Sequence, residues 1–168
     1  MKSSKATLFF FVGLFSITAC NKAFIIEDVN YAQYVESVLI PDENGIISDY
    51  RNSLSFSVAS ISDLEFGEDH NETISEIRLI RNRNGYYFLT ADQFKNVYVF
   101  EPKKGELKLK ETIEISELGL QSPVFNWRDP YVEIIANNRE ETHYLNEKGI
   151  IVEENVLMGR QHSILLLL

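Results

Sequence analysis

The 168-residue chain carries 16 basic and 25 acidic side chains, which gives a formal net charge of −9. Its length predicts one domain, and 45% hydrophobic with 24% charged residues is the balance of an ordinary folded protein. A surface this acidic repels phosphate backbones, and no dense stripe of Lys and Arg offsets it, so nucleic acid is excluded as a partner. Cys20 is the single cysteine, which rules out an internal disulfide and any zinc or redox site built from cysteines.

The N-terminus has the layout of an export signal. Lys2 and Lys5 supply a short positive stretch, and the residues that follow, 6–19, carry no charge. As a helix, these residues would rise about 21 Å, which is short of the roughly 30 Å hydrocarbon core of a bilayer. The segment therefore predicts the hydrophobic region of a signal peptide and not a transmembrane helix.

The residues that end this segment, Ile17-Thr18-Ala19-Cys20, resemble the lipobox of bacterial lipoproteins. The resemblance implies that residues 1–19 are a signal peptide cleaved after Ala19, and that the Cys20 thiol carries diacylglycerol. The two or three acyl chains of a lipoprotein cysteine suffice for stable membrane anchoring. Asn21 in place of aspartate implies the absence of an inner-membrane retention signal, so we expect an outer-membrane lipoprotein of the cell envelope. A plain secretory signal with a chance cysteine is the alternative.

After a membrane-proximal segment, residues 20–37, the chain reads as a β-domain over residues 38–157. Short runs rich in Val, Ile, Tyr, Phe and Thr alternate with turn signals such as Pro41–Gly45. The expected strands are Val38–Ile40, Ser53–Val58, Ile74–Ile80, Tyr86–Ala91, Asn96–Glu101, Leu107–Ile115, Tyr131–Ala136, Glu141–Leu145 and Ile150–Glu153. Their spacing of about 8–12 residues predicts antiparallel meanders, and no helical periodicity extends over twelve residues, so the expected class is all-β. Ser116–Leu120 is expected to form a single turn.

A weak internal repeat supports this class. Three residues each have a counterpart 44 positions later, namely Tyr87 with Tyr131, Phe100 with Tyr144, and Gly105 with Gly149. The run Tyr86–Gly105 resembles one blade of the six-bladed β-propeller lipoproteins of bacteria. This resemblance implies a partial, β-propeller-like fold of about two to three blades, because one blade takes roughly 40–50 residues.

An apolar tail, residues 158–168, closes the chain with five consecutive aliphatic residues, Ile164–Leu168. They are too few to span a bilayer. A buried last strand, a sticky tail and the out-of-frame end of a truncated reading frame all stay open as interpretations.

The search for chemistry yields no catalytic, cofactor-binding or metal-binding residue. His70, His143 and His162 form none of the local pairs that bind metals, and the acidic run Glu65–Glu72 lacks the ligand pattern of a calcium loop. Trp127 and Arg128 lie in an expected loop between two blades, where they could stack on a sugar or grip a partner protein. Packing of the Trp127 ring in the core is the simpler interpretation, and we favour it.

Three functions stay open. The leading hypothesis is a non-enzymatic protein, held at the membrane by acylated Cys20, whose β-domain binds an envelope protein or a glycan. The second is a carbohydrate-active enzyme with a pair of carboxylates that the sequence does not reveal. The third is a truncated propeller lipoprotein with no function of its own.

Overall fold

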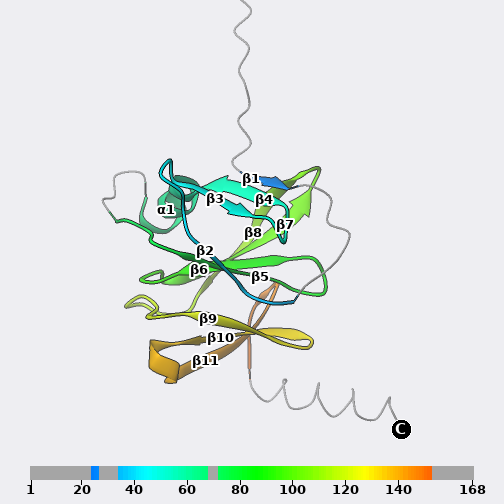
Figure 1. The fold of residues 1–168 in the computed structure, drawn as a ribbon. Coiled ribbons are helices and arrows are strands. Elements are labelled where there is room, and N and C mark those ends of the chain that lie inside the picture. The colour runs from blue at the N-terminus through cyan, green and yellow to red at the C-terminus, as the bar shows by residue number, and fades with distance from the viewer. Residues whose placement is uncertain (1–23, 27–33, 68–71, 153–168) are drawn as a thin grey trace, which may run out of the picture.

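The computed structural model describes residues 24–26, 34–67 and 72–152, and most of these residues lie in antiparallel β-strands (Figure 1). The strands and helices are β1 (Phe24–Ile26), β2 (Ser37–Leu39), β3 (Ile46–Asp49), β4 (Leu54–Ser57), α1 (Val58–Phe66), β5 (Ile77–Arg81), β6 (Tyr87–Ala91), β7 (Asn96–Lys103), β8 (Glu106–Glu114), β9 (Val124–Arg128), β10 (Tyr131–Ala136), the 3₁₀ turn η1 (Asn137–Arg139), β11 (Glu141–Asn146) and β12 (Gly149–Ile151). The predicted all-β class with antiparallel meanders is confirmed.

The strands form two sheets. The larger sheet has eight strands in the order β2-β5-β6-β7-β8-β1-β4-β3, and the smaller has four in the order β12-β11-β10-β9. Figure 1 shows three tiers, with β1, β3, β4 and α1 at the top, β5 and β6 in the middle, and β9 to β11 at the bottom. Strand β1 lies within the predicted membrane-proximal segment and pairs with both β4 and β8.

Strands β5 to β8 and strands β9 to β12 are two four-stranded meanders, which is the size of one propeller blade. A core cluster joins them face to face. It contains Ile80, Phe88, Val97, Val99 and Ile113 from the first meander, and Phe125, Val132, Ile134, Ala136 and Leu145 from the second. The sheet that contains the first meander continues through β1 and β2, so it is not the separate four-stranded sheet that a propeller blade has.

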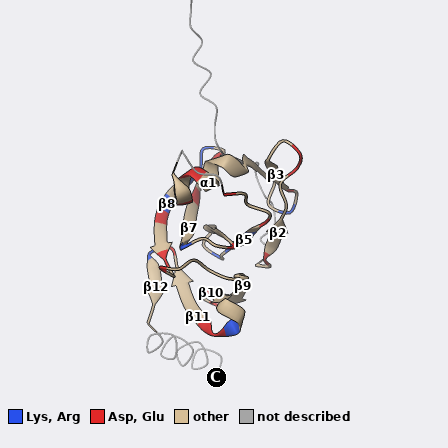
Figure 2. Ribbon diagram, turned by 90° about the vertical axis from the view of Figure 1, so that its left-hand side faces the viewer, with Lys and Arg blue, Asp and Glu red and all other residues tan. Residues whose placement is uncertain are grey.

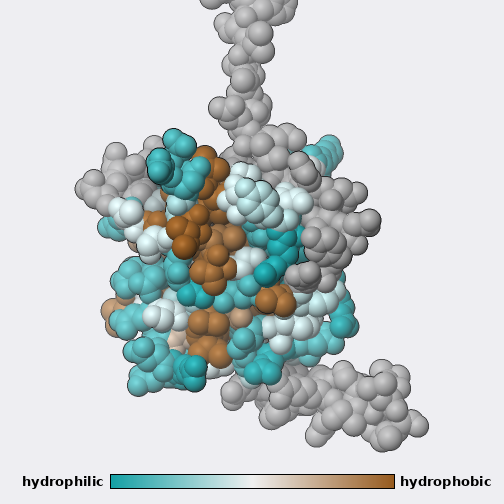
Figure 3. Space-filling view, viewed as in Figure 1, coloured by the Kyte–Doolittle hydropathy of each residue, from teal (hydrophilic) through white to brown (hydrophobic). Residues whose placement is uncertain are grey.

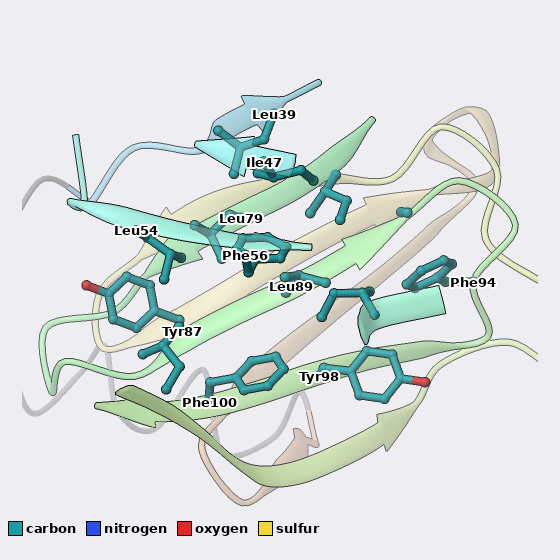
Figure 4. Close-up of a cluster of buried hydrophobic side chains, with 14 residues drawn as sticks. Leu39, Ile47, Leu54, Phe56, Leu79, Tyr87, Leu89, Phe94, Tyr98 and Phe100 are labelled. Carbon is teal, nitrogen blue, oxygen red and sulfur yellow. The ribbon is translucent and has the colours of Figure 1, made fainter. Parts of the chain in front are cut away.

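A second core cluster covers the opposite face of the first meander (Figure 4). There, Leu79, Leu89 and Phe100 meet Leu54 and Phe56 of β4. Side chains alternate between the two faces of a strand. The side chains of β6 therefore point in turn to one core cluster and to the other, and all five residues of the strand are buried. The first meander is therefore buried on both faces.

Helix α1 was not expected from the sequence, which predicted a strand through Val58. The strand ends one residue earlier, because the Ser57 hydroxyl accepts a hydrogen bond of 3.3 Å from the backbone N–H of Ala59 and caps the helix. At the other end, the N–H of Gly67 bonds to Asp63 O at 3.0 Å with φ at 86°, a conformation that favours glycine. The Glu65 carboxylate accepts the Tyr98 hydroxyl at 2.8 Å and so holds the helix to β7.

The two predicted strand pairs are confirmed, as β6 with β7 and β10 with β11. Their registers differ, however. Tyr87 lies opposite Phe100, whereas Tyr144, the counterpart of Phe100, lies opposite Glu133. The two halves of the repeat thus share their topology and the face to which each residue points. The register between the paired strands, however, differs by two residues. The single turn expected at Ser116–Leu120 is also present.

Candidate binding site

The segment that contains Trp127 and Arg128 was predicted to be a loop between blades, and this prediction is wrong. Val124–Arg128 is strand β9, the edge strand of the smaller sheet, and Arg128 pairs with Tyr131 across a tight turn. Because consecutive side chains of a strand point to opposite faces, Trp127 and Arg128 do not form one stacking pair. The structure instead places them on the two sides of β9.

Trp127 is partly buried. One side of it packs against the core cluster between the meanders, as the simpler interpretation predicted. Its ring also stacks on Tyr34, with 5.0 Å between ring centroids and 25° between ring planes. Tyr34 lies 93 positions earlier in the sequence, so no local pattern predicted this contact.

A groove runs along the free edge of β9. The segment before β2 forms one wall with Tyr34, Val35 and Glu36, and β9 forms the other, Val124–Arg128. The groove encloses about 470 Å³. We name it the edge groove.

Glu36 spans the edge groove and fastens the two sheets together. One oxygen, Oε1, accepts the backbone N–H of Phe125 at 2.7 Å, and Oε2 accepts Arg78 Nη1 of β5 at 3.2 Å. Its own backbone is held by Arg51, whose Nη1 donates to Glu36 O at 3.1 Å. Burial raises the pKa of the Glu36 carboxyl, and the bonds from Phe125 and Arg78 only partly offset that effect.

A second hollow lies on the outer face of the smaller sheet and encloses about 630 Å³. It is lined by Ser122, Val124, Asn126, Ile135, Asn138 and Arg139. We name it the outer hollow. Val124 and Asn126 line both cavities, so the edge groove and the outer hollow meet across β9. We refer to the two together as the β9 site.

Glu133 lies on this outer face, next to the β9 site, and is almost fully buried at 5% exposure. Its Oε2 accepts Asn126 Nδ2 and Arg128 Nε, both at 3.0 Å, and Tyr144 of β11 is a further hydrogen-bond donor. Burial alone would raise the pKa of this carboxyl, but the bonds from Asn126 and Arg128 outweigh burial and leave the pKa below its ordinary value. Glu133 therefore stays ionised and fixes the side chains of Asn126 and Arg128.

Apolar side chains frame the site. Val124 is 36% exposed and Ile135 is partly buried, and the space-filling view shows a small hydrophobic patch in the lower half of the molecule, surrounded by hydrophilic surface (Figure 3). A larger hydrophobic band lies higher on the same face (Figure 3). Fixed hydrogen-bonding groups beside modest apolar surface suit a polar ligand with apolar ring faces.

No sequence pattern pointed to Glu36 or Glu133, which are ordinary glutamates in strand-like runs. Cys20, Ala19 and the tail at residues 158–168 lie outside the described residues, as do residues 68–71 of the acidic run Glu65–Glu72. Within the described part of the chain, no three His, Cys, Asp or Glu side chains cluster as metal ligands would. No helix in that same part is long and apolar enough to cross a bilayer.

Comparison with known proteins gives no family for this chain. No protein-family model, no curated protein and no solved structure matches it.

Proposed function

We propose that this chain is a lipid-anchored protein of the bacterial cell envelope whose β-domain binds a glycan at the β9 site. The anchor rests on the order of basic residues, apolar stretch and Ile17–Cys20 in the sequence. The ligand class rests on one observation, which is that two cavities meet across β9 and are lined by a stacked Trp127–Tyr34 pair and by prearranged Asn126 and Arg128.

A glycan suits this lining better than the apolar core of a protein interface does. Sugar hydroxyls both donate and accept hydrogen bonds, and Asn126, Asn138 and Ser122 offer both kinds of group. Sugar rings also present apolar faces to aromatic and aliphatic side chains such as those of Tyr34 and Val124. Protein interfaces of the stable kind are centred on a larger apolar patch than the β9 site presents.

The glycan function is tested with the full chain in detergent on an array of defined oligosaccharides. Tyr34→Ala removes the stack on Trp127 and should weaken binding about ten-fold, equivalent to about 1.4 kcal/mol. Tyr50→Ala is the matched control, since Tyr50 is 92% exposed and lines neither cavity. Binding to no oligosaccharide, or equal losses in both variants, would overturn the proposal; capture of a protein partner instead would support the protein-binding hypothesis.

The anchor has its own test. Cys20→Ala should move the protein out of the detergent phase in a phase-partition assay, or leave it uncleaved, because the thioether to diacylglycerol needs the thiol. A Cys20→Ala protein that matures and partitions like the wild type would refute lipidation at this residue.

A carbohydrate-active enzyme is the second candidate. Its candidate residues are Glu36, which lines the edge groove, and Glu133, which lies beside it, because acid and base catalysis of this kind uses two carboxyls. Both carboxyls already serve as hydrogen-bond acceptors within the protein, which favours a structural role. Hydrolysis of a bound oligosaccharide that is abolished in Glu36→Gln would support the enzyme instead.

A further inference from the structure

We infer that the glycan bound at the β9 site is acidic, and that Arg128 and Arg139 recognise its carboxylate or sulfate groups. This inference rests on the proposed function and narrows its ligand class. It is carried by the position, bonding and backbone conformation of the two arginines.

Only part of the Arg128 guanidinium forms hydrogen bonds within the described protein. Its Nε donates to Glu133, while no described residue bonds to its two Nη groups, and the side chain is 52% exposed. The bond to Glu133 fixes the plane of the guanidinium. A planar guanidinium with free Nη donors matches the two oxygens of a carboxylate or sulfate.

Arg139 lines the outer hollow from the turn between β10 and β11, where Figure 2 marks a basic residue beside acidic ones. The backbone there is left-handed at three consecutive residues, with φ of 53° at Asn137, 57° at Asn138 and 74° at Arg139. Asparagine tolerates this region, but arginine adopts it at a cost. An unfavourable backbone conformation at a residue that lines a cavity points to a role for its side chain.

The turn is held by contacts that leave Arg139 out. Asn137 N–H donates to Gln121 O at 2.8 Å, and Gln121 N–H donates to Asn137 Oδ1 at 3.0 Å. The Asn137 side-chain amide also donates to Glu141. No described residue forms an ion pair with Arg139, so the fold fixes the turn without using its charge.

Three of the acidic side chains near the site are already occupied, whereas Glu140, next to Arg139, is exposed and lines neither cavity. Glu133 is bonded by Arg128, Glu36 by Arg78, and Glu141 by Asn137 and His143. None of the residues that line the outer hollow is acidic. A net charge of −9 repels anions at long range, but salt screens that repulsion beyond about 8 Å at physiological ionic strength. The charges of the two arginines therefore favour an anionic ligand at this site.

The test measures binding of the full chain in detergent to oligogalacturonate, a sugar chain with one carboxylate per residue. The matched ligand is the same oligomer with its carboxylates reduced to neutral alcohols. We expect the acidic form to bind at least ten-fold more tightly. A sulfated oligosaccharide separates the two sources of negative charge, and preferential binding of either acidic form supports the inference.

Arg139→Gly is the decisive variant, because glycine adopts the left-handed turn without strain. It should reduce binding of the acidic oligomer at least ten-fold and leave the unfolding midpoint unchanged or higher. Arg83→Ala is the control, an exposed arginine that lines neither cavity, and it should bind like the wild type.

Three results would overturn the inference. Equal binding of the reduced oligomer would leave a glycan-binding protein with no preference for acids. Undiminished binding by Arg139→Gly would show that the arginine is not part of the site. Tighter binding of a glutamate-rich peptide than of any sugar would mean that the acid is presented by a protein. Failure to bind any sugar would, by contrast, remove the proposed function itself.

Discussion

The two meanders use equivalent faces in opposite ways. In the first, Tyr87, Leu89 and Phe100 point to a face that β3, β4 and α1 cover, and all three are buried. The residues 44 positions later are Tyr131, Glu133 and Tyr144, and they point to the outer face of the smaller sheet. Where the first meander has Leu89, the second has a carboxylate.

Coverage of a face by another layer, and not the strand pattern, separates the core from the candidate site. A face covered by another layer must be apolar, because a buried polar group without partners costs free energy. A face without a described covering layer can hold Glu133, provided that Asn126, Arg128 and Tyr144 satisfy it. The candidate site lies on this second face.

The largest expected effect comes from placing the carboxylate on the covered face. Leu89→Glu puts a charge among apolar side chains with no partner, and should cost about 4 kcal/mol or more of the free energy of unfolding. Leu89→Met, which conserves volume, should cost less than about 1.5 kcal/mol. Urea denaturation measures both. A Leu89→Glu protein with near wild-type stability would show that the first meander is not covered there.

The reciprocal change should be much milder. Glu133→Leu removes three hydrogen bonds, but Arg128 is half exposed and can bind water instead. We expect a loss of about 1–2 kcal/mol in the free energy of unfolding. A loss as large as that of Leu89→Glu would contradict this contrast between the covered and the uncovered face.

Most strands of the two meanders were predictable from the sequence, because strand runs and turn signals are local. The sequence predicted β6, β7, β10 and β11 to within a residue or two at most of their ends. Strand β9 was missed because Val124–Arg128 is a short run with a polar centre, enclosed between Pro123 and Pro130. Helix α1 was missed because a helix of nine residues is too short to set its own periodicity.

The site was less predictable than the fold. Trp127 and Arg128 were found by residue type alone, and the sequence placed them in a loop. Their partners lie far away along the chain, since Glu36 and Phe125 are separated by 89 positions. Only the packing of β5 against β9 brings such residues together, and no local pattern encodes it.

The third prediction concerns pH, where Glu36 and Glu133 should act in opposite directions. The pKa of Glu133 is lowered from 4.5, so its stabilising contribution is present above about pH 4.5 and is lost as the pH falls through the folded-state pKa. The pKa of Glu36 is raised, so its contribution is present below about pH 4.5 and is lost as the pH rises through the folded-state pKa.

Stability measured across that range should separate the two groups. Glu133→Gln should reduce the loss of stability that occurs as the pH falls below about 4.5. Glu36→Gln should reduce the loss that occurs as the pH rises above about 4.5. Each variant serves as the control for the other. Both variants altering the same side would mean that one of the two carboxyls lacks the partners described for it.

The smallest change in stability is expected for substitutions in the turns that connect the second and third strands of each meander. In the first meander one residue of this turn, Gln93, is left-handed, with φ at 67°. In the second, three are, and Arg139 is the one for which that region is costly. Arg139→Gly relieves the strain but adds freedom to the unfolded chain, so its net gain in the free energy of unfolding should be small, about 0.5 kcal/mol.

Arg139→Ala keeps the strain and removes the same charge, which isolates the backbone effect. Arg139→Gly should therefore be more stable than Arg139→Ala in parallel thermal unfolding. The reverse order would mean that Arg139 does not pay a backbone cost, and the case for its side chain would then rest on position and charge alone.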